Sequence, residues 1–319
     1  MIAARHLVGV GAVVTTVAAA AAAQGARAAA MRRRISWSPG AGTTYDGALH
    51  ARTVGDGPTG VVLLHGLGGS NAYWGGAYDT LASAGRLVVP DLLGFGDSPH
   101  PPSGYTTDDH VAALVALLDE LGVTGPVVVG AHSLGCLLAI ALADRRPDLV
   151  AAVVAFCPPL YPDEATARDR ISSLGLLERQ LATDSPWAET DCAWVCRHPR
   201  GAALIAAAVR PGIPSPIRRD GMRHSWASYS QTFRHVLASA ESGKVLARLQ
   251  VPVELVAGTA DGVTDLGYLR LLAGQLAHVT LTVREGADHD PPLTDPSGAV
   301  ATLTRAARLL GPAAVVVPG

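Results

Sequence analysis

The chain has 319 residues, enough for one large domain or two modest ones, because single hydrophobic cores stop growing near roughly 250–300 residues. Acidic residues number 27 against 25 basic ones, and a formal charge of −2 argues against the strong positive field that nucleic-acid binding requires. Lys244 is the single lysine, which argues against Schiff-base chemistry. The 4 cysteines do not make a disulfide scaffold at this length.

Residues 1–34 form a segment of their own. The apolar run from Leu7 to Ala23 is short for a membrane span but has the length of a signal-peptide core. The arginines at 32–34 follow it and are suited to hold an uncleaved anchor. We therefore expect a signal peptide or an N-terminal membrane tether, and an exported or anchored protein. The alternative is translation from Met31, which predicts a cytoplasmic protein.

From Tyr45 onward, short β-branched runs alternate with longer segments of helical period. Strands are expected at Val61–Leu64, Leu87–Pro90, Val127–Ala131, Ala151–Phe156, Val253–Ala257 and Val279–Val283, and helices at Asp108–Leu121, Ser133–Arg145 and Ser297–Leu310. This alternation predicts an α/β fold with a mostly parallel, doubly wound sheet flanked by helices.

The alternation stops between Pro158 and Leu249, where helical segments and proline-rich turns replace it. We expect residues 35–157 and 250–319 to form the α/β core and residues 158–249 to form a helical cap. Ligands of such sheets bind outside the carboxyl ends of the strands, so an insertion that emerges there is placed to cover the ligand site.

Ser133 lies between the strand ending at Ala131 and an apolar helix, with small residues, Ala131 and Gly135, two positions to either side. A sharp strand-to-helix turn needs small neighbours, and the helix N-terminus directs free N–H groups toward the serine. These features predict a nucleophile elbow, in which Ala131 stands where the usual pattern has glycine. Taken alone, the segment also fits an ordinary turn.

A serine nucleophile needs a histidine base and an acid that orients it. Asp261 follows the strand that begins at Val253, and His289 follows the strand that begins at Val279. The chain order is therefore Ser, Asp, His, with each side chain at the carboxyl end of a predicted strand. We predict that these three residues form a catalytic triad.

The strand Val61–Leu64 runs into a glycine-rich turn, His65–Ser70. Such a turn lets backbone N–H groups face an anionic oxygen, and we assign the oxyanion donors to the amides of Leu67 and Leu134. The turn lacks the glycine spacing of a dinucleotide loop and the Gly-Lys pair of a phosphate loop. We therefore predict no cofactor.

Four elements in this order resemble the α/β-hydrolase superfamily. They are the turn His65–Ser70, the block Asp91–Ser98, the elbow at Ser133 and the two loops that carry Asp261 and His289. The resemblance covers about Tyr45 to Leu310 apart from the insertion. It implies a capped serine hydrolase, with the cap inserted after the sixth strand, and it implies that Asp91 and Asp97 are structural.

We predict that the enzyme cleaves a carboxylic ester of a moderately apolar small molecule through an acyl-enzyme. In this scheme Ser133 attacks the carbonyl, His289 takes its proton and Asp261 orients His289. The same residues also suit a carbon–carbon bond hydrolase or an acyl transferase that tailors a natural product. A protein that binds its ligand without turnover is the further alternative.

Aromatic side chains in and near the insertion are candidates for the acyl pocket. We expect Trp74, Trp187, Trp226 and Tyr229 to line it, although aromatic residues of a small helical cap also serve as its core.

Cys192 and Cys196 lie one helical turn apart, with His198 nearby. No second pair of metal ligands at a suitable spacing accompanies them, so we predict no metal site.

Overall fold

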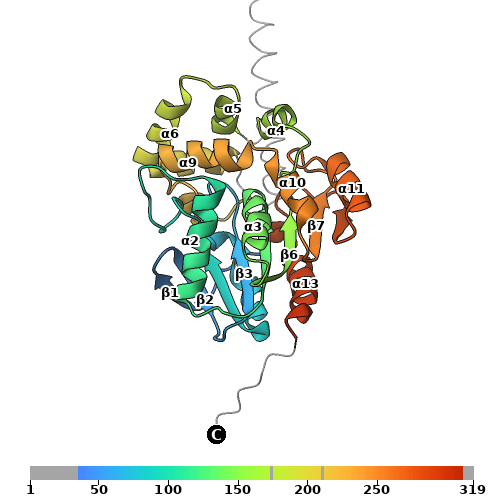
Figure 1. Ribbon diagram of the computed structural model, residues 1–319. Coiled ribbons are helices and arrows are strands. Elements are labelled where there is room, and N and C mark those ends of the chain that lie inside the picture. The colour runs from blue at the N-terminus through green and yellow to red at the C-terminus, as the bar shows by residue number, and fades with distance from the viewer. Residues whose placement is uncertain (1–34, 173–174, 210–211, 312–319) are drawn as a thin grey trace, which may run out of the picture.

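The computed structural model describes residues 35–172, 175–209 and 212–311 (Figure 1). The expected signal peptide or anchor falls on residues 1–34, outside the described ranges. Within those ranges, no helix combines the length and the apolar character needed to cross a bilayer.

The core is an 8-stranded sheet in the order β1-β2-β4-β3-β5-β6-β7-β8. The strands are β1 (Thr43–Asp46), β2 (His50–Val54), β3 (Gly60–Leu64), β4 (Arg86–Pro90), β5 (Val127–His132), β6 (Val150–Phe156), β7 (Val253–Gly258) and β8 (Val279–Arg284). Strands β3 to β8 pair in parallel, whereas β1 pairs antiparallel with β2 and β2 with β4. The predicted fold class is confirmed, but the sequence analysis missed β1 and β2.

Helices cover both faces of the sheet (Figure 1). One face is covered by α2 (Thr107–Glu120), α3 (Leu134–Arg145), α10 (Glu241–Arg248) and α11 (Leu266–Gln275), and the other by the 3₁₀ segment η2 (Gly76–Ala84) and by α13 (Pro296–Ala307). In place of the single helix predicted at 297–310, the structure has α13 followed by a short 3₁₀ turn, η4 (Arg308–Leu310). Two apolar cores result, one on each side of the sheet.

The segment between β6 and β7 is helical throughout most of its described length. Its helices are α4 (Glu164–Ile171), α5 (Leu176–Ala182), α6 (Ala188–Arg197), α7 (Pro199–Val209), α8 (Ser215–Asp220), α9 (Trp226–Thr232), the π-helix η3 (Phe233–Leu237) and α10. Two short elements remain elsewhere in the described chain, η1 (Asn71–Tyr73) and α12 (Pro291–Thr294). In Figure 1, α5, α6 and α9 lie together above the sheet.

Contacts tie this insertion to the turn that follows β4. The N–H of Gly96 donates to the carbonyl of Arg223 at 2.9 Å, and Phe95 and His224 form an isolated antiparallel bridge. The guanidinium of Arg223 also pairs with the carboxylate of Asp97. The segment before α9 is therefore held against the core by both backbone and side-chain contacts.

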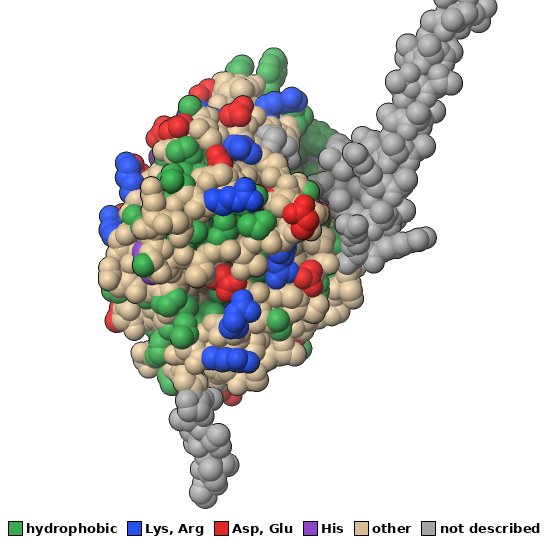
Figure 2. Space-filling view, turned by 90° about the vertical axis from the view of Figure 1, so that its right-hand side faces the viewer, with side chains coloured by type: hydrophobic (Ala, Val, Ile, Leu, Met, Phe, Trp, Pro, Cys, Tyr) green, Lys and Arg blue, Asp and Glu red, His purple; other side chains and the backbone are tan. Residues whose placement is uncertain are grey.

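On the face shown in Figure 2, basic and acidic side chains are interspersed rather than gathered by sign. Hydrophobic side chains lie between them on the same face. This pattern agrees with the balanced formal charge of −2.

A buried histidine links the insertion to α2. The Nε2 of His110 lies 3.0 Å from the hydroxyl of Thr232 in α9, and burial lowers the pKa of His110 to about 4, although the nearby charge of Asp109 opposes that shift. His110 is therefore neutral in the folded protein at pH 7.

The folded protein is expected to lose stability on acidification, because unfolded His110 takes up a proton near the ordinary histidine pKa of 6.5 whereas folded His110 does so only near 4. Between these values the unfolded state binds more protons, so the free energy of unfolding falls as pH falls. From pH 7 to pH 5 the His110 contribution is about 2 kcal/mol. Urea unfolding of the wild type and of His110→Gln at both pH values measures it. If the free energy of unfolding of the wild type falls between pH 7 and pH 5 by no more than that of His110→Gln, then His110 is not the source of the loss.

Candidate active site

Ser133 lies at the turn between β5 and α3, where its φ of 51° falls in the left-handed region that non-glycine residues rarely adopt. A Cβ on Gly135 would lie 2.6 Å from the carbonyl oxygen of His65, and one on Gly66 would lie 3.1 Å from the Cβ of Ser133. The turn is thus packed so closely against the turn after β3 that only small residues fit beside the serine. Strain at this position is typical of a nucleophile elbow.

The structure brings Ser133, His289 and Asp261 together. The Nε2 of His289 lies 3.0 Å from the Oγ of Ser133, and its Nδ1 lies 2.9 Å from the Oδ2 of Asp261. The three residues follow β5, β8 and β7 respectively, so each comes from the carboxyl end of a parallel strand. With Nδ1 protonated, the imidazole donates to the carboxylate and accepts the serine proton at Nε2.

Asp261 is fully enclosed, with a side-chain exposure of 0 %. Burial alone would raise its pKa, but hydrogen bonds from His289, from the hydroxyl of Thr264 and from the N–H of Val263 outweigh it. Together they hold the pKa of Asp261 well below the usual range. The carboxylate is therefore charged at neutral pH, and it can stabilise an imidazolium at His289.

The loop that carries His289 is anchored by His132, the residue before the serine. The Nε2–H of His132 donates to the carbonyl of His289 at 2.8 Å, and the ring of Tyr73 stacks on His132 with centroids 4.6 Å apart. Tyr73 also donates to Asp290 at 3.3 Å. Burial, together with the nearby His289, lowers the pKa of His132 to about 4, so its ring is neutral at pH 7.

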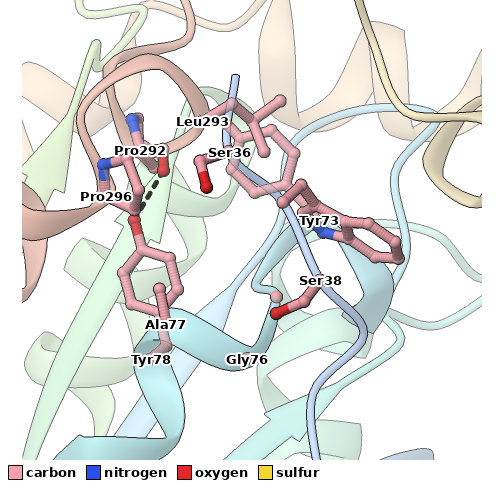
Figure 3. A pocket seen from close by; sticks show the side chains of 11 residues that line it. Ser36, Ser38, Tyr73, Gly76, Ala77, Tyr78, Pro292, Leu293 and Pro296 are labelled. Atoms are coloured by element: carbon pink, nitrogen blue, oxygen red, sulfur yellow. Dashed lines mark hydrogen bonds between the residues drawn. The ribbon is translucent and has the colours of Figure 1, made fainter. Parts of the chain in front are cut away.

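A second anchor lies on the far side of the same loop. In the narrow crevice of Figure 3, the hydroxyl of Tyr78 donates to the carbonyl of Pro292 at 2.8 Å. Ser36, Ser38 and Tyr73 also line this crevice. The start of α12, two residues after His289, is thus held against η2.

Of the two residues predicted to supply oxyanion donors, Leu134 directly follows the serine, and Leu67 lines the same cavity as Ser133. Leu134 is the first residue of α3, where N–H groups have no acceptor within the helix, and Leu67 belongs to the turn after β3. His65 holds that turn in place, because its Nδ1 bonds the carbonyl of Gly66 at 2.8 Å and its Nε2 accepts from the N–H of Leu92 at 2.9 Å. Burial lowers the pKa of His65, which keeps the ring neutral for both bonds.

Asp91 contacts backbone groups rather than the triad. Its carboxylate accepts hydrogen bonds from the N–H of Asn71 at 2.5 Å and from the N–H of Asp97 at 2.8 Å. It thereby joins the turns after β3 and β4, as expected for a structural residue. Burial raises the pKa of Asp91, partly offset by His65.

A cavity of about 430 Å³ opens onto Ser133 and His289, between the core and the insertion. Most of its wall is apolar and includes Leu67, Leu176, Leu177, Val195, Ile213, Ile217, Leu237 and Leu293. Its polar side chains include Glu178, Arg218, His224 and Tyr229. This size and lining are typical of a small-molecule site.

Of the aromatic residues expected in the pocket, Tyr229 lines the cavity and donates its hydroxyl to Glu178. Trp74 does not line it, because it is 0 % exposed and packs edge-on against Tyr78 in the core on the other side of the sheet. Trp187 is 66 % exposed and Trp226 packs against the core, so neither reaches the cavity wall. Trp194, another aromatic residue of the insertion, also lines it.

These observations define the class of protein. A mostly parallel sheet with helices on both faces carries a serine at a strained strand-to-helix turn, and an acid and a histidine follow later strands in that order. The geometry and the chain order are those of an α/β hydrolase.

Comparison with known proteins agrees. Residues 61–303 match the family model described as the alpha/beta hydrolase family. The chain is 30% identical over 254 residues to a putative carbamate hydrolase, RutD, of Pseudomonas syringae, covering 78% of this chain and 93% of that protein. A lipase of Mycobacterium tuberculosis, LipV, is 39% identical over 127 residues, which are 40% of this chain and 48% of the lipase.

Among solved structures, E-2-(acetamidomethylene)succinate hydrolase superposes with a TM-score of 0.63 at 22% identity, over 81% of this chain and 94% of that one. At this identity the likeness shows the fold alone. The family match and the similarity to the carbamate hydrolase establish that the chain belongs to the α/β-hydrolase family.

Proposed function

We propose that this protein is a serine hydrolase that cleaves a carboxylic ester of a moderately apolar small molecule. The observation that carries the proposal is the position of His289, whose ring bridges the hydroxyl of Ser133 at 3.0 Å and the carboxylate of Asp261 at 2.9 Å. Hydrolase chemistry is general to the family, whereas the ester and the residue roles are our proposal.

The geometry supports the following reaction. His289 takes the proton of Ser133 as the oxygen attacks the acyl carbonyl, and the charged Asp261 stabilises the imidazolium that forms. The amides of Leu67 and Leu134 hold the oxyanion of the tetrahedral intermediate. His289 then returns the proton to the leaving alcohol, which departs and leaves the acyl-enzyme. Water, activated by His289, attacks that ester and releases the acid and the free serine.

The cavity supports a substrate of modest size and apolar character. Its volume of about 430 Å³ accommodates a small molecule rather than a polymer, and aliphatic side chains form most of its wall. Its polar groups are few, so orientation within it depends on contacts such as those of Glu178 and Arg218. We infer an acyl group that packs against the aliphatic wall.

Product analysis tests this proposal. The purified protein is incubated with aryl esters of increasing acyl length, a matched amide and a vinylogous diketone, each with and without an added amine acceptor. We expect one acid and one alcohol per ester cleaved, with kcat/KM rising as the acyl chain lengthens and then falling once it exceeds the cavity. Preferential cleavage of the diketone would contradict the proposal and indicate a carbon–carbon bond hydrolase. Dominant acylation of the amine would contradict it and indicate an acyl transferase.

A protein that only binds its ligand would behave differently. A fluorophosphonate probe forms a bond only with an activated serine, so the proposal predicts stoichiometric labelling of the native protein that heat denaturation abolishes. Absence of labelling together with absence of turnover across the panel would favour an inert pocket.

A further inference from the structure

Within the insertion, two thiols from one helix lie close to an imidazole from another segment. Cys192 and Cys196 lie on successive turns of α6, and His224 comes from the segment just before α9. Their candidate ligand atoms, the two Sγ atoms and an imidazole nitrogen, all lie within 4.8 Å of one another. The mechanism proposed above uses none of these groups.

One ring nitrogen of His224, Nε2, is available to bind a ligand. Its Nδ1 lies 3.1 Å from the carbonyl of Gly221, to which it donates, so Nε2 carries the free lone pair. That Nε2 is buried and accepts no well-aligned hydrogen bond from the described residues, although the Cys196 thiol interacts with the ring, and the whole residue is only 9 % exposed. An unpartnered buried acceptor is costly, which points to a ligand that the structure does not contain.

The neighbouring groups keep the imidazole and the thiols in place. The ring of His224 packs against Tyr229, with centroids 4.7 Å apart, and the thiol of Cys196 donates to the carbonyl of His224 at 3.1 Å. Cys192 is fully buried and its thiol hydrogen-bonds with that of Cys196. Neither cysteine is in a disulfide.

We propose that Cys192, Cys196 and His224 bind a thiophilic divalent cation of the Zn²⁺ type beside the active-site cavity. In a tetrahedral zinc site with Zn–S near 2.3 Å and Zn–N near 2.0–2.1 Å, ligand atoms are about 3.5–3.8 Å apart. The present separations of at most 4.8 Å therefore close by no more than roughly 1.3 Å on binding. Two thiolates and an imidazole select such an ion over the oxygen-seeking Mg²⁺ and Ca²⁺. Three protein ligands leave a fourth coordination position for water.

Binding would have a structural consequence. The ion would join α6 to the segment that already bridges Phe95 in the turn after β4. This link would hold α6, which contributes Trp194 and Val195 to the cavity wall, against the core. Because an ion that binds the folded state preferentially stabilises it, saturating Zn²⁺ should raise the melting temperature by about 5 °C.

Titration with Cd²⁺ tests the site independently of any enzyme activity. The protein is kept reduced with a phosphine and stripped with a chelator, and Cd²⁺ is added while thiolate-to-metal charge-transfer absorption is recorded. We expect saturation at one equivalent in the wild type. The Cys196→Ser and His224→Gln variants should lose at least about 100-fold in affinity, because loss of an outer-shell partner alone costs roughly 10–100-fold.

The matched control is His198→Gln. His198 directly follows the same helix but is not one of the clustered groups. Its Nδ1 lies 3.0 Å from the carbonyl of Trp194, and its ring stacks on the Trp194 indole. This variant should bind Cd²⁺ as the wild type does. Circular dichroism and melting without metal establish that each variant is folded, and His224→Gln carries the test if Cys196→Ser fails to fold.

The proposal is overturned if the wild type shows no one-equivalent binding, or if Cys196→Ser and His224→Gln bind as tightly as the wild type. A loss of affinity in His198→Gln equal to that in His224→Gln would likewise place the ion elsewhere. Failure of ester hydrolysis would not affect the outcome, because the binding measurement requires no turnover.

Discussion

Replacing Ser133 by alanine is expected to lower kcat for ester hydrolysis by about 10⁴–10⁶-fold if the triad acts as a unit. The serine oxygen lies 3.0 Å from His289 and faces the cavity, and alanine removes that nucleophile. Alanine tolerates the positive φ as well as serine does, so the fold should remain. Initial rates on the preferred aryl ester and the far-UV circular dichroism spectrum measure the two effects.

A matched control separates the nucleophile from serine replacement in general. Ser103 is exposed on the loop before α2 and is not among the described residues that line the cavity, so Ser103→Ala should retain the wild-type rate. Fluorophosphonate labelling should disappear in Ser133→Ala and persist in Ser103→Ala. Undiminished turnover by pure, folded Ser133→Ala would end the assignment of the nucleophile.

Replacing Asp261 by asparagine is expected to lower kcat by about 10⁴-fold with little change in KM. Asp261 accepts the Nδ1–H of His289 at 2.9 Å while three further donors, from Val263 and Thr264, hold its carboxylate in place. An amide can present its N–H₂ to His289 instead, which favours the tautomer that cannot accept the serine proton. It also removes the charge that stabilises the imidazolium. Steady-state kinetics on the same ester provide the measurement.

Asp265 supplies the control for this variant. It is a nearby carboxylate that caps α11 by accepting from the N–H of Tyr268 at 3.0 Å, a role that asparagine performs well. Asp265→Asn should therefore retain nearly full activity. If Asp261→Asn loses less than about tenfold, another group orients His289 and the proposed acid is incorrect.

Much of the fold was predictable because its signals are local. A run such as Val127–Val129 followed by small residues predicts a buried strand ending in a tight turn, and the structure has β5 there. Likewise, the apolar spacing of Asp108–Leu121 predicts α2, which Thr106 and Asp109 begin with a capping box. By contrast, β1 and β2 are short, partly exposed strands without clear alternation, so tertiary pairing with β4 decides their conformation.

The candidate site also has a part that the sequence predicts and a part that only packing decides. The order of Ser133, Asp261 and His289, each after a predicted strand, is visible in the chain, and parallel strands bring their carboxyl ends to one edge of the sheet. Which aromatic residues line the cavity is not visible there. Trp74 and Tyr229 are both large aromatic side chains, yet packing places Trp74 in a core and Tyr229 in the wall of the cavity.

The amino-acid sequence was enough to predict the strands of the parallel sheet, the tight turn at Ser133 and the loops that carry Asp261 and His289, because each depends on residues close together in the chain. Tertiary structure alone decided that His132 anchors the carbonyl of His289, 157 residues away, and that His224 rather than His198 meets the two thiols. Such contacts join segments whose separation in sequence carries no periodic signal. They arise only when burial of both apolar cores fixes how those segments pack.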